Sequence, residues 1–493
     1  MQPELPFDFG EYSHRTLGIT VNLPLALGER LKEILPLLVT GVAEDHLSGF
    51  RSLFREAANE DEAFLALGYA SALKHELRHF HDYLLSPAGA ADGAVHMMAA
   101  VNMNLAMVAL SQQEEIVLPL QTWERLQERW YKILQRNGKG SLSPKPPERT
   151  RPYTEAATIA FEALRQREIA SVELHDGRLT TARILECSAL AVQATYLILN
   201  YGAEAWPAFR DGLFRADRSS VYTTVWRLWD QAFQWLPQGV QLSYFVLNSI
   251  LFMSLCGLPD MARSMGFRDD PPYRLVDILE YLARRQEVPT DDNILPLLDS
   301  WAANNGLLSM IDSVDLAIRS DSEYVDNTVS EIRAIESNVG APIFGDMPEV
   351  LKQWTGARAH MAQQFIEDPR CYLDPVLYLK NPERFVASPM FLATTSGVLD
   401  RDGELAVMLR GEGWKPIFGR RSEDGSKAAH WLMRAPRMTA GHEFLTQKQS
   451  WDLSSAIWLS HLLWAPDMLG PVEREVALTA ARSLLPNTTV LVL

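Results

Sequence analysis

Cysteine is scarce in this chain, with three residues in 493. Cys187, Cys256 and Cys371 lie far apart, and no two of them form a C-x-x-C pair. An odd number of scattered cysteines argues against a disulfide framework, and the missing C-x-x-C spacing argues against a cysteine-rich zinc module. Both absences favour an intracellular protein.

Positive charge is also in deficit. The chain has 46 lysines and arginines against 62 aspartates and glutamates, which gives a formal net charge of −16. Proteins that bind nucleic acid gain most of their affinity by neutralising phosphates, so this balance disfavours them. We therefore predict a cytoplasmic protein with no nucleic-acid partner.

Long uninterrupted apolar runs are missing as well. The first eighteen residues carry acids and no apolar core of the kind that a secretory signal has. The most apolar run is LSYFVLNSILFMSLCGL at 242–258, which is short for a membrane span and is interrupted by serines and Asn248. We predict that this run is a buried helix, and that the protein has no membrane partner.

Most of the chain instead shows the apolar periodicity of amphipathic helices. Short alternating runs predict strands at 18–23 and 114–120, and Gly/Asp turns predict a small β-containing section after residue 386. We therefore expect a mainly α (α+β) fold. The predicted helices are 25–38, 61–85, 93–111, 122–137, 153–169, 178–200, 219–235 and 241–256, with further helices over 272–368.

The stretch ALKHELRHFHDYLL at 72–85 contains an H-E-x-x-H motif on a predicted helix that ends at Ser86-Pro87. His75 and His79 are one turn apart, so their side chains lie about 6 Å from each other on one face and can converge on a tetrahedral metal ion. Glu76 would lie beside that ion, where its carboxylate can take a proton from water. The motif predicts two metal ligands and a general base. Apolar residues on both sides of the helix predict that it is buried.

A third ligand must come from elsewhere in the chain. Asp82 lies about 10 Å along the helix axis from His75, so it cannot share the ion and is expected to hydrogen-bond His79 instead. The best candidate is Glu186 in GRLTTARILECSALAVQATYLI, because a lone carboxylate in an apolar helix is costly unless it is paired or bound to a cation. A salt bridge to Arg183, one turn earlier, is the alternative explanation. Three other acids remain in reserve as ligands: Glu155, Glu162 and Glu173.

With HELRH at 75–79 and LECSA at 185–189, the chain resembles the zincin metallopeptidases of the gluzincin type, which use two histidines and one glutamate. The resemblance covers these two motifs and little else. The pattern of the metzincins is absent, because Asp82 and Leu85 stand where that group has glycine and histidine. The separation between the two motifs is longer than usual for the family.

The resemblance implies that Zn²⁺ is bound by His75, His79 and Glu186, and that the protein hydrolyses a peptide bond in a protein or peptide substrate. Zinc would lower the pKa of water and polarise the scissile carbonyl, while Glu76 would take the proton and pass it to the leaving amine. A further donor must stabilise the oxyanion. The candidates for this role are Tyr153, His175, Arg183 and Tyr196.

These motifs also suggest how the chain is divided. We predict a zincin-like catalytic domain over 1–200, a helical domain over 201–385 and a C-terminal α+β section over 386–493. The Pro-rich segment 138–152 would then be a surface insertion within the catalytic domain. The length beyond a minimal zincin domain suggests a selective intracellular protease with a regulatory or toxic role.

The alternative is a non-catalytic helical protein that binds other proteins, in which HELRH is a chance match or a structural metal site. Two tryptophan-rich segments, TTVWRLWDQAFQWL and SWDLSSAIWLSHLLW, would then be partner surfaces, although such stripes more often form core. The position of Glu186 relative to the two histidines separates the two hypotheses.

Overall fold

The computed structural model describes a little over half of the chain. The described residues are 9–13, 18–23, 55, 57, 59–91, 115–118, 171–174, 177–216, 221–237, 240–257, 269–339, 347–386, 390–394, 462, 470–484 and 489–492. Within them the fold is mainly α, which confirms the predicted fold class. The predicted helices at 25–38, 93–111, 122–137 and 153–169, the segment 138–152 and the second tryptophan-rich segment, except Leu462, lie outside the described residues.

The chain divides into two compact units. The first consists of residues 1–93, 170–326 and 352–433, and the second of residues 94–169, 327–351 and 434–493. Helices on both sides of residue 200 belong to the first unit, and they pack against one another. The predicted domain boundaries at 200 and 385 stay predictions.

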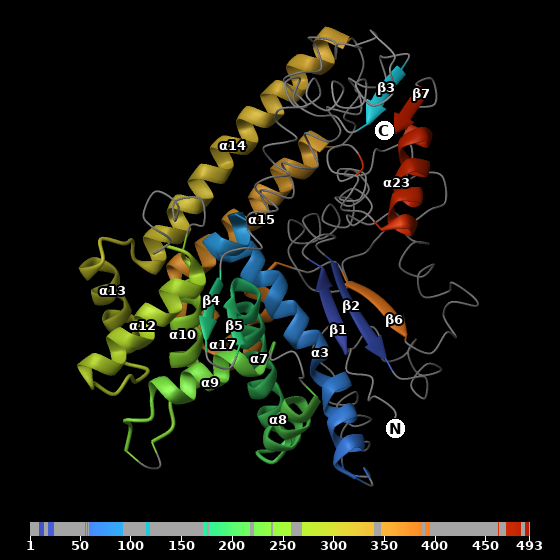
Figure 1. The fold of residues 1–493 in the computed structure, drawn as a ribbon. Coiled ribbons are helices and arrows are strands. Elements are labelled where there is room, and N and C mark those ends of the chain that lie inside the picture. Colours follow the sequence, from blue (N-terminus) through green and yellow to red (C-terminus); the bar gives the residue numbers. More distant parts are fainter. Residues whose placement is uncertain are drawn as a thin grey trace, which may run out of the picture. The chain divides into compact units, whose positions relative to one another are not determined.

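The described part of the first unit consists of helices and two small sheets (Figure 1). Its helices are α3 (Glu60–Leu85), α7 (Thr181–Tyr201), α8 (Ala205–Ala216), α9 (Thr223–Ala232), α10 (Tyr244–Leu255), α12 (Pro271–Arg285), α13 (Ile294–Asn304), α16 (Pro369–Leu373), α17 (Pro375–Lys380) and a 3-10 turn at Pro382–Arg384. The division between the units falls within α14 (Met310–Val339) and α15 (Met347–Glu367).

Helix α3 has defined signals at both ends, as the sequence predicts. The side chain of Asn59 accepts a hydrogen bond from the Glu62 N–H (2.9 Å), which satisfies one of the free donors of the first turn. At the other end the Ser86 N–H donates to the Asp82 carbonyl (2.9 Å). Arg358 of α15 donates from Nε to the Leu84 carbonyl (2.9 Å), so the last turn is also tied to a distant helix.

A three-stranded sheet lies along α3. Strand β2 (Gly18–Leu23) pairs antiparallel with β1 (Gly10–Ser13) and parallel with β6 (Met390–Thr394). The predicted strand at 18–23 and the β structure predicted after residue 386 are both confirmed. Because β6 belongs to the same sheet as β1 and β2, the region after 386 contributes a strand to the first unit. In Figure 1, α3 runs between this sheet and α7, and it packs against both.

The structure corrects the start of the predicted helix 178–200. Residues Gly177–Thr180 form strand β5, which pairs antiparallel with β4 (Ser171–Leu174), and α7 begins only at Thr181. The hydroxyl of Thr180 caps the helix by accepting from the Arg183 N–H (3.3 Å). The Asp-Gly dipeptide at 176–177 is a hairpin signal that the helical periodicity obscured.

Helix α10 forms the centre of the core. All residues from Phe245 to Leu255 are buried, so the predicted buried helix within 242–258 is confirmed. Its serines satisfy their hydroxyls within the helix; Ser249, for example, donates to the Phe245 carbonyl (2.8 Å). Helix α10 packs against both α7 and α12, and so supports α7 on the side away from solvent.

Among the described helices, α7 is long and apolar enough to cross a membrane, but 67% of that stretch is buried inside the protein.

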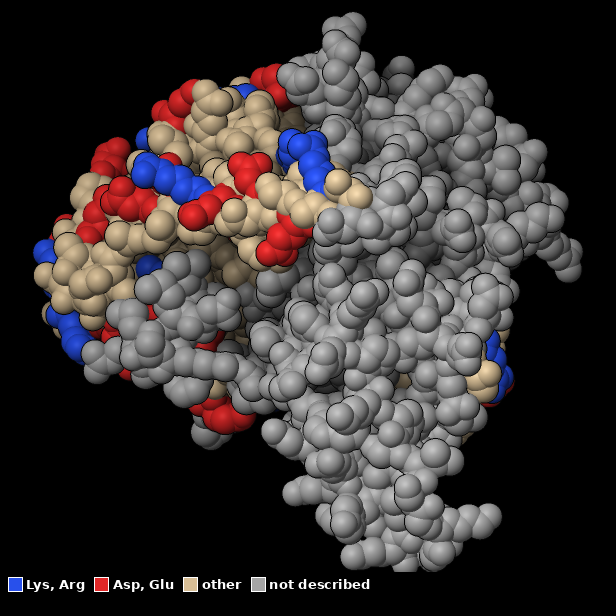
Figure 2. All heavy atoms as spheres, turned by 90° about the horizontal axis from the view of Figure 1, so that it is seen from above, with Lys and Arg blue, Asp and Glu red and all other residues tan. Residues whose placement is uncertain are grey.

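The second unit contains the parallel pair β3 (Glu115–Leu118) and β7 (Thr489–Val492), together with α23 (Pro471–Leu484). The strand predicted at 114–120 is thereby confirmed. Leu118, Ala477 and Ala481 are buried in this unit. On the face drawn in Figure 2, the described residues carry acidic and basic side chains intermingled.

Two helical glycines give a test of the packing around α3. A Cβ at Gly212 on α8 would lie 2.6 Å from Cδ2 and 2.9 Å from Cβ of Phe64, whereas a Cβ at Gly356 on α15 meets nothing within 4 Å. We predict that Gly212→Ala lowers the free energy of unfolding by about 1–3 kcal/mol through overpacking. Gly356→Ala should raise it by up to about 1 kcal/mol. Urea denaturation of both variants checks this, and equal effects would contradict the packing described.

Candidate metal centre

The two histidines of the H-E-x-x-H motif lie on a buried stretch of α3. His75 is 5% exposed, Glu76 6% and His79 6%, which confirms that this helix is buried on both of its sides. The sheet β1-β2-β6 packs against α3 and so does α7. Because the helical spacing places both imidazoles on one face, their rings meet edge to face with centroids 4.7 Å apart.

Helix α7 brings Glu186 to the same point. Its Oε2 lies 3.0 Å from His75 Nε2 and 3.2 Å from His79 Nε2, and the two Nε2 atoms are 3.1 Å apart. The sequence alternative, an ion pair of Glu186 with Arg183, is not formed, because Glu186 pairs with the histidines. Of the predicted metal ligands, the structure brings all three together.

This triangle of atoms is difficult to satisfy with protons alone. If both imidazoles donate a proton to Glu186 Oε2, no proton remains for a hydrogen bond between the two nitrogens. His75 Nε2 and His79 Nε2 then face each other at 3.1 Å without a bond. A cation interacts with all three atoms at once. Tetrahedral zinc with bonds of 2.0–2.2 Å places its ligand atoms roughly 3.3 Å apart, and the separations of 3.0, 3.1 and 3.2 Å are close to this value. The residues therefore fit a zinc ion.

The electrostatics of Glu186 suit a ligand. Burial alone raises the pKa of this carboxyl, but the neighbouring charge of His79 and the hydrogen bonds from both imidazoles outweigh burial and hold the pKa well below its usual range. The carboxyl is therefore ionised at neutral pH, which is the form that binds a metal.

Asp82 does not have the role that the sequence suggested. We expected its carboxylate to hydrogen-bond His79, but the structure places it on another side of α3, where Arg78 donates to Oδ2 from Nε (3.2 Å) and Tyr372 donates to Oδ1 (2.6 Å). Asp82 is fully buried in this arrangement. The sequence spacing predicts the position of Asp82 along the helix axis correctly, but it does not predict the contact with Tyr372.

His81 is held away from the candidate centre. Its Nε2 donates to the Val386 carbonyl (2.7 Å), because a carbonyl can only accept, and its Nδ1 is 2.7 Å from the Tyr378 hydroxyl. Both ring nitrogens therefore bind other parts of the first unit.

Of the four predicted oxyanion donors, two lie in the described residues. Arg183 is three residues before Glu186 on α7, and its side chain donates to the Thr224 hydroxyl (3.0 Å). Tyr196 is about 15 Å farther along α7 than Glu186; its ring lies 6.0 Å from Nζ of Lys74. Tyr153, His175 and the reserve acids Glu155 and Glu162 lie outside the described residues. The third reserve, Glu173, is on β4 and exposed, with Arg178 as its partner (3.5 Å).

Tyr222 is a residue near the site that the sequence analysis missed. It directly precedes α9, and its ring centroid is 6.0 Å from that of His75 in an edge-to-face arrangement. No local pattern marks it, because the contact joins residues that are far apart in the sequence. Its ring lies beside His75, and a phenol hydroxyl can donate a hydrogen bond.

A scan against models of protein families found no match, and searches among curated proteins and solved structures found none either. The assignment of a function therefore rests on the geometry of the chain itself.

The structural role of His81 can be tested directly. We predict that His81→Leu lowers the free energy of unfolding by about 2–4 kcal/mol, because two buried hydrogen bonds are lost. His360→Leu, at an exposed position, is the control and should change it by less than about 0.5 kcal/mol. Urea denaturation measures both, and an unchanged stability of His81→Leu would refute the assignment.

Proposed function

We propose that this protein is a zinc-dependent metallopeptidase that hydrolyses a peptide bond in a protein or peptide substrate. The observation that supports the proposal is the convergence of His75, His79 and Glu186 from two separate helices, with all three ligating atoms within 3.2 Å of one another. The resemblance of HELRH and LECSA to the gluzincin motifs points the same way. A selective intracellular role is part of this proposal.

Each residue of the motif has a chemical task. Zinc, when bound by the triad, supplies a Lewis acid that polarises the scissile carbonyl and makes water more acidic. Glu76 is adjacent to His75 on α3 and buried, so its carboxylate can accept the proton of the attacking water and return it to the leaving amine. His75, Glu76 and His79 are each at most 6% exposed, so bulk water competes little for their contacts.

Tyr222 is the donor that we propose for the developing oxyanion. It neighbours His75, and phenol hydroxyls can stabilise negative charge in a dry site. Arg183, at the start of α7, is the other candidate that the described residues retain. A Tyr222→Phe variant should lower kcat more than it changes KM, because the oxyanion forms only in the transition state.

Metal content tests the centre. Purified without a histidine tag, the wild type should contain about one zinc per chain, measured by plasma mass spectrometry, and His75→Ala should lose it. His360→Ala, which removes an exposed imidazole, is the matched control and should retain the metal. A wild type that binds no zinc would overturn the proposal and favour the alternative of a helical interaction protein.

The catalytic role of Glu76 needs a separate test. We predict that Glu76→Gln keeps zinc but lowers hydrolysis of a fluorogenic peptide mixture by about 10²–10⁴-fold, because the amide cannot accept the proton. Glu323→Gln on the exposed side of α14 makes the same chemical change away from the site and should leave the rate unaltered. Equal rates for wild type and Glu76→Gln would exclude the peptidase mechanism.

A further inference from the structure

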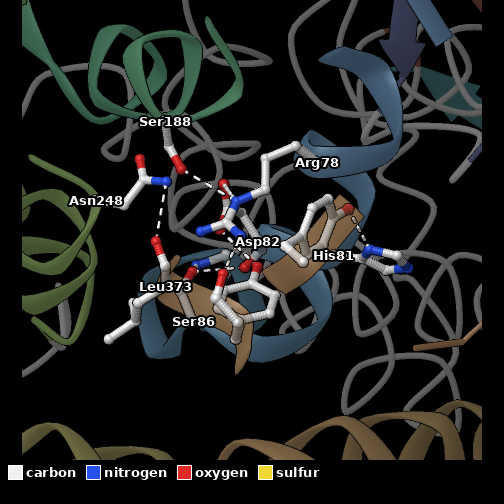
Figure 3. A network of polar contacts seen from close by, with 10 residues as sticks. Arg78, His81, Asp82, Ser86, Ser188, Asn248 and Leu373 are labelled. Carbon is white, nitrogen blue, oxygen red and sulfur yellow. Dashed lines mark hydrogen bonds and ion pairs between the residues drawn. The ribbon is translucent and has the colours of Figure 1, made fainter. Parts of the chain in front are cut away.

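A buried polar network joins helices α3, α7 and α16 next to the candidate metal centre. Arg78 is at the centre of the network (Figure 3). In the sequence of α3 it stands between His75 and His79. Nε of Arg78 donates to Asp82 (3.2 Å) and to the Ser188 hydroxyl (3.2 Å), and Nη1 donates to the Tyr372 carbonyl (2.8 Å). One side chain thus connects α3, α7 and α16.

Tyr372 and Asp82 also interact with each other around the guanidinium, whose Nη2 is buried without a hydrogen-bond partner among the described residues. The Tyr372 hydroxyl donates to Asp82 Oδ1 (2.6 Å), while the Tyr372 ring lies 3.9 Å from the Arg78 guanidinium carbon. Arg78 and Asp82 are fully buried, and Tyr372 and Ser188 are each 1% exposed. Desolvating an ion pair to this extent costs about as much as the pair returns, so stability alone does not account for it.

Its connection to α7 is close to the proposed ligand. Ser188 is two residues after Glu186, about 200° around the helix. Contacts at two such different angles define the rotation of α7 as well as its position along α3. A second buried bond, from Gln193 Nε2 to the Ser71 hydroxyl (2.7 Å), crosses the same interface one turn before His75. Along α7, both polar connections therefore follow Glu186, and the one at Ser188 is the nearer to the ligand triangle.

We propose that Arg78 is a positioning residue for the metal centre, which acts through its hydrogen bond to Ser188. Asp82 and Tyr372 hold the guanidinium in place, and the bond to Ser188 holds Glu186 within ligating distance of His75 and His79. The inference depends on the proposed function, because it concerns the same metal centre. On this proposal, the buried ion pair of Arg78 and Asp82 positions a metal ligand in addition to packing in the core.

The sharpest test removes a single hydroxyl. Ser188→Ala deletes the link from Arg78 to α7 and leaves every charged partner in place. We expect its zinc affinity, measured by competition with a chromophoric chelator, to fall about 10–100-fold, as for other residues that orient metal ligands. With Co²⁺ in place of zinc, the visible absorption bands should weaken and shift, because Glu186 no longer completes the ligand set.

Ser249→Ala is the matched control. Ser249 is equally buried, but its hydroxyl bonds only the carbonyl of Phe245 in its own helix, α10. It loses the same group as Ser188→Ala without touching the interface between α3 and α7. Its zinc affinity and cobalt spectrum should equal those of the wild type, so a general loss of packing is separated from a loss of positioning.

A second variant removes the network without leaving a charge unpaired. The triple change Arg78→Met, Asp82→Leu and Tyr372→Phe replaces the polar groups together, which such buried networks often tolerate. We expect the folded protein to bind zinc at least about tenfold more weakly than the wild type. If this variant does not fold, Ser188→Ala decides the question alone.

The possible failures differ in what they overturn. A wild type that binds neither zinc nor cobalt removes the proposed function, and the inference with it. A wild type that binds zinc, with Ser188→Ala equal to it in affinity and cobalt spectrum, leaves the metal centre standing and overturns the role of Arg78.

Discussion

The candidate site depends on the antiparallel contact between α3 and α7. Ser71 meets Gln193 near one end of this contact, and His79 meets Glu186 near the other. Three ligating atoms lie within 3.2 Å of one another only because both helices keep this register. A shift by one residue along either helix moves a ligand by 1.5 Å and 100° around the axis, which is enough to break the triangle.

The rest of the first unit holds this contact in place. The sheet β1-β2-β6 supports α3 on one side, and α10 supports α7 from the core. The ends of α3 are also fixed, since Arg358 donates to the Leu84 carbonyl and Phe64 stacks on Phe209 of α8 (centroids 5.3 Å apart). The part-buried carboxylate of Glu186 is stabilised by the two imidazoles, and a cation held by all three groups would add to that stabilisation.

Local patterns in the sequence predict single helices and strands and the residues on their faces. The spacing of His75 and His79 predicted their shared face, and the apolar surroundings of Glu186 predicted a carboxylate in need of a partner. The position of Asp82 was predicted wrongly, because its partner Tyr372 is nearly three hundred residues away and no local pattern points to it. Tyr222 and the pairing of β2 with β6 were missed for the same reason, since they arise only when distant segments pack together.

The central claim is that α3 and α7 together form one metal-binding site. The most direct measurement is anomalous diffraction at the zinc edge from crystals of the zinc-loaded protein. The account predicts one strong peak at about 2.0–2.2 Å from Nε2 of His75, Nε2 of His79 and a carboxylate oxygen of Glu186. No peak at this position, or a peak bound by the histidines with Glu186 turned away, would contradict it.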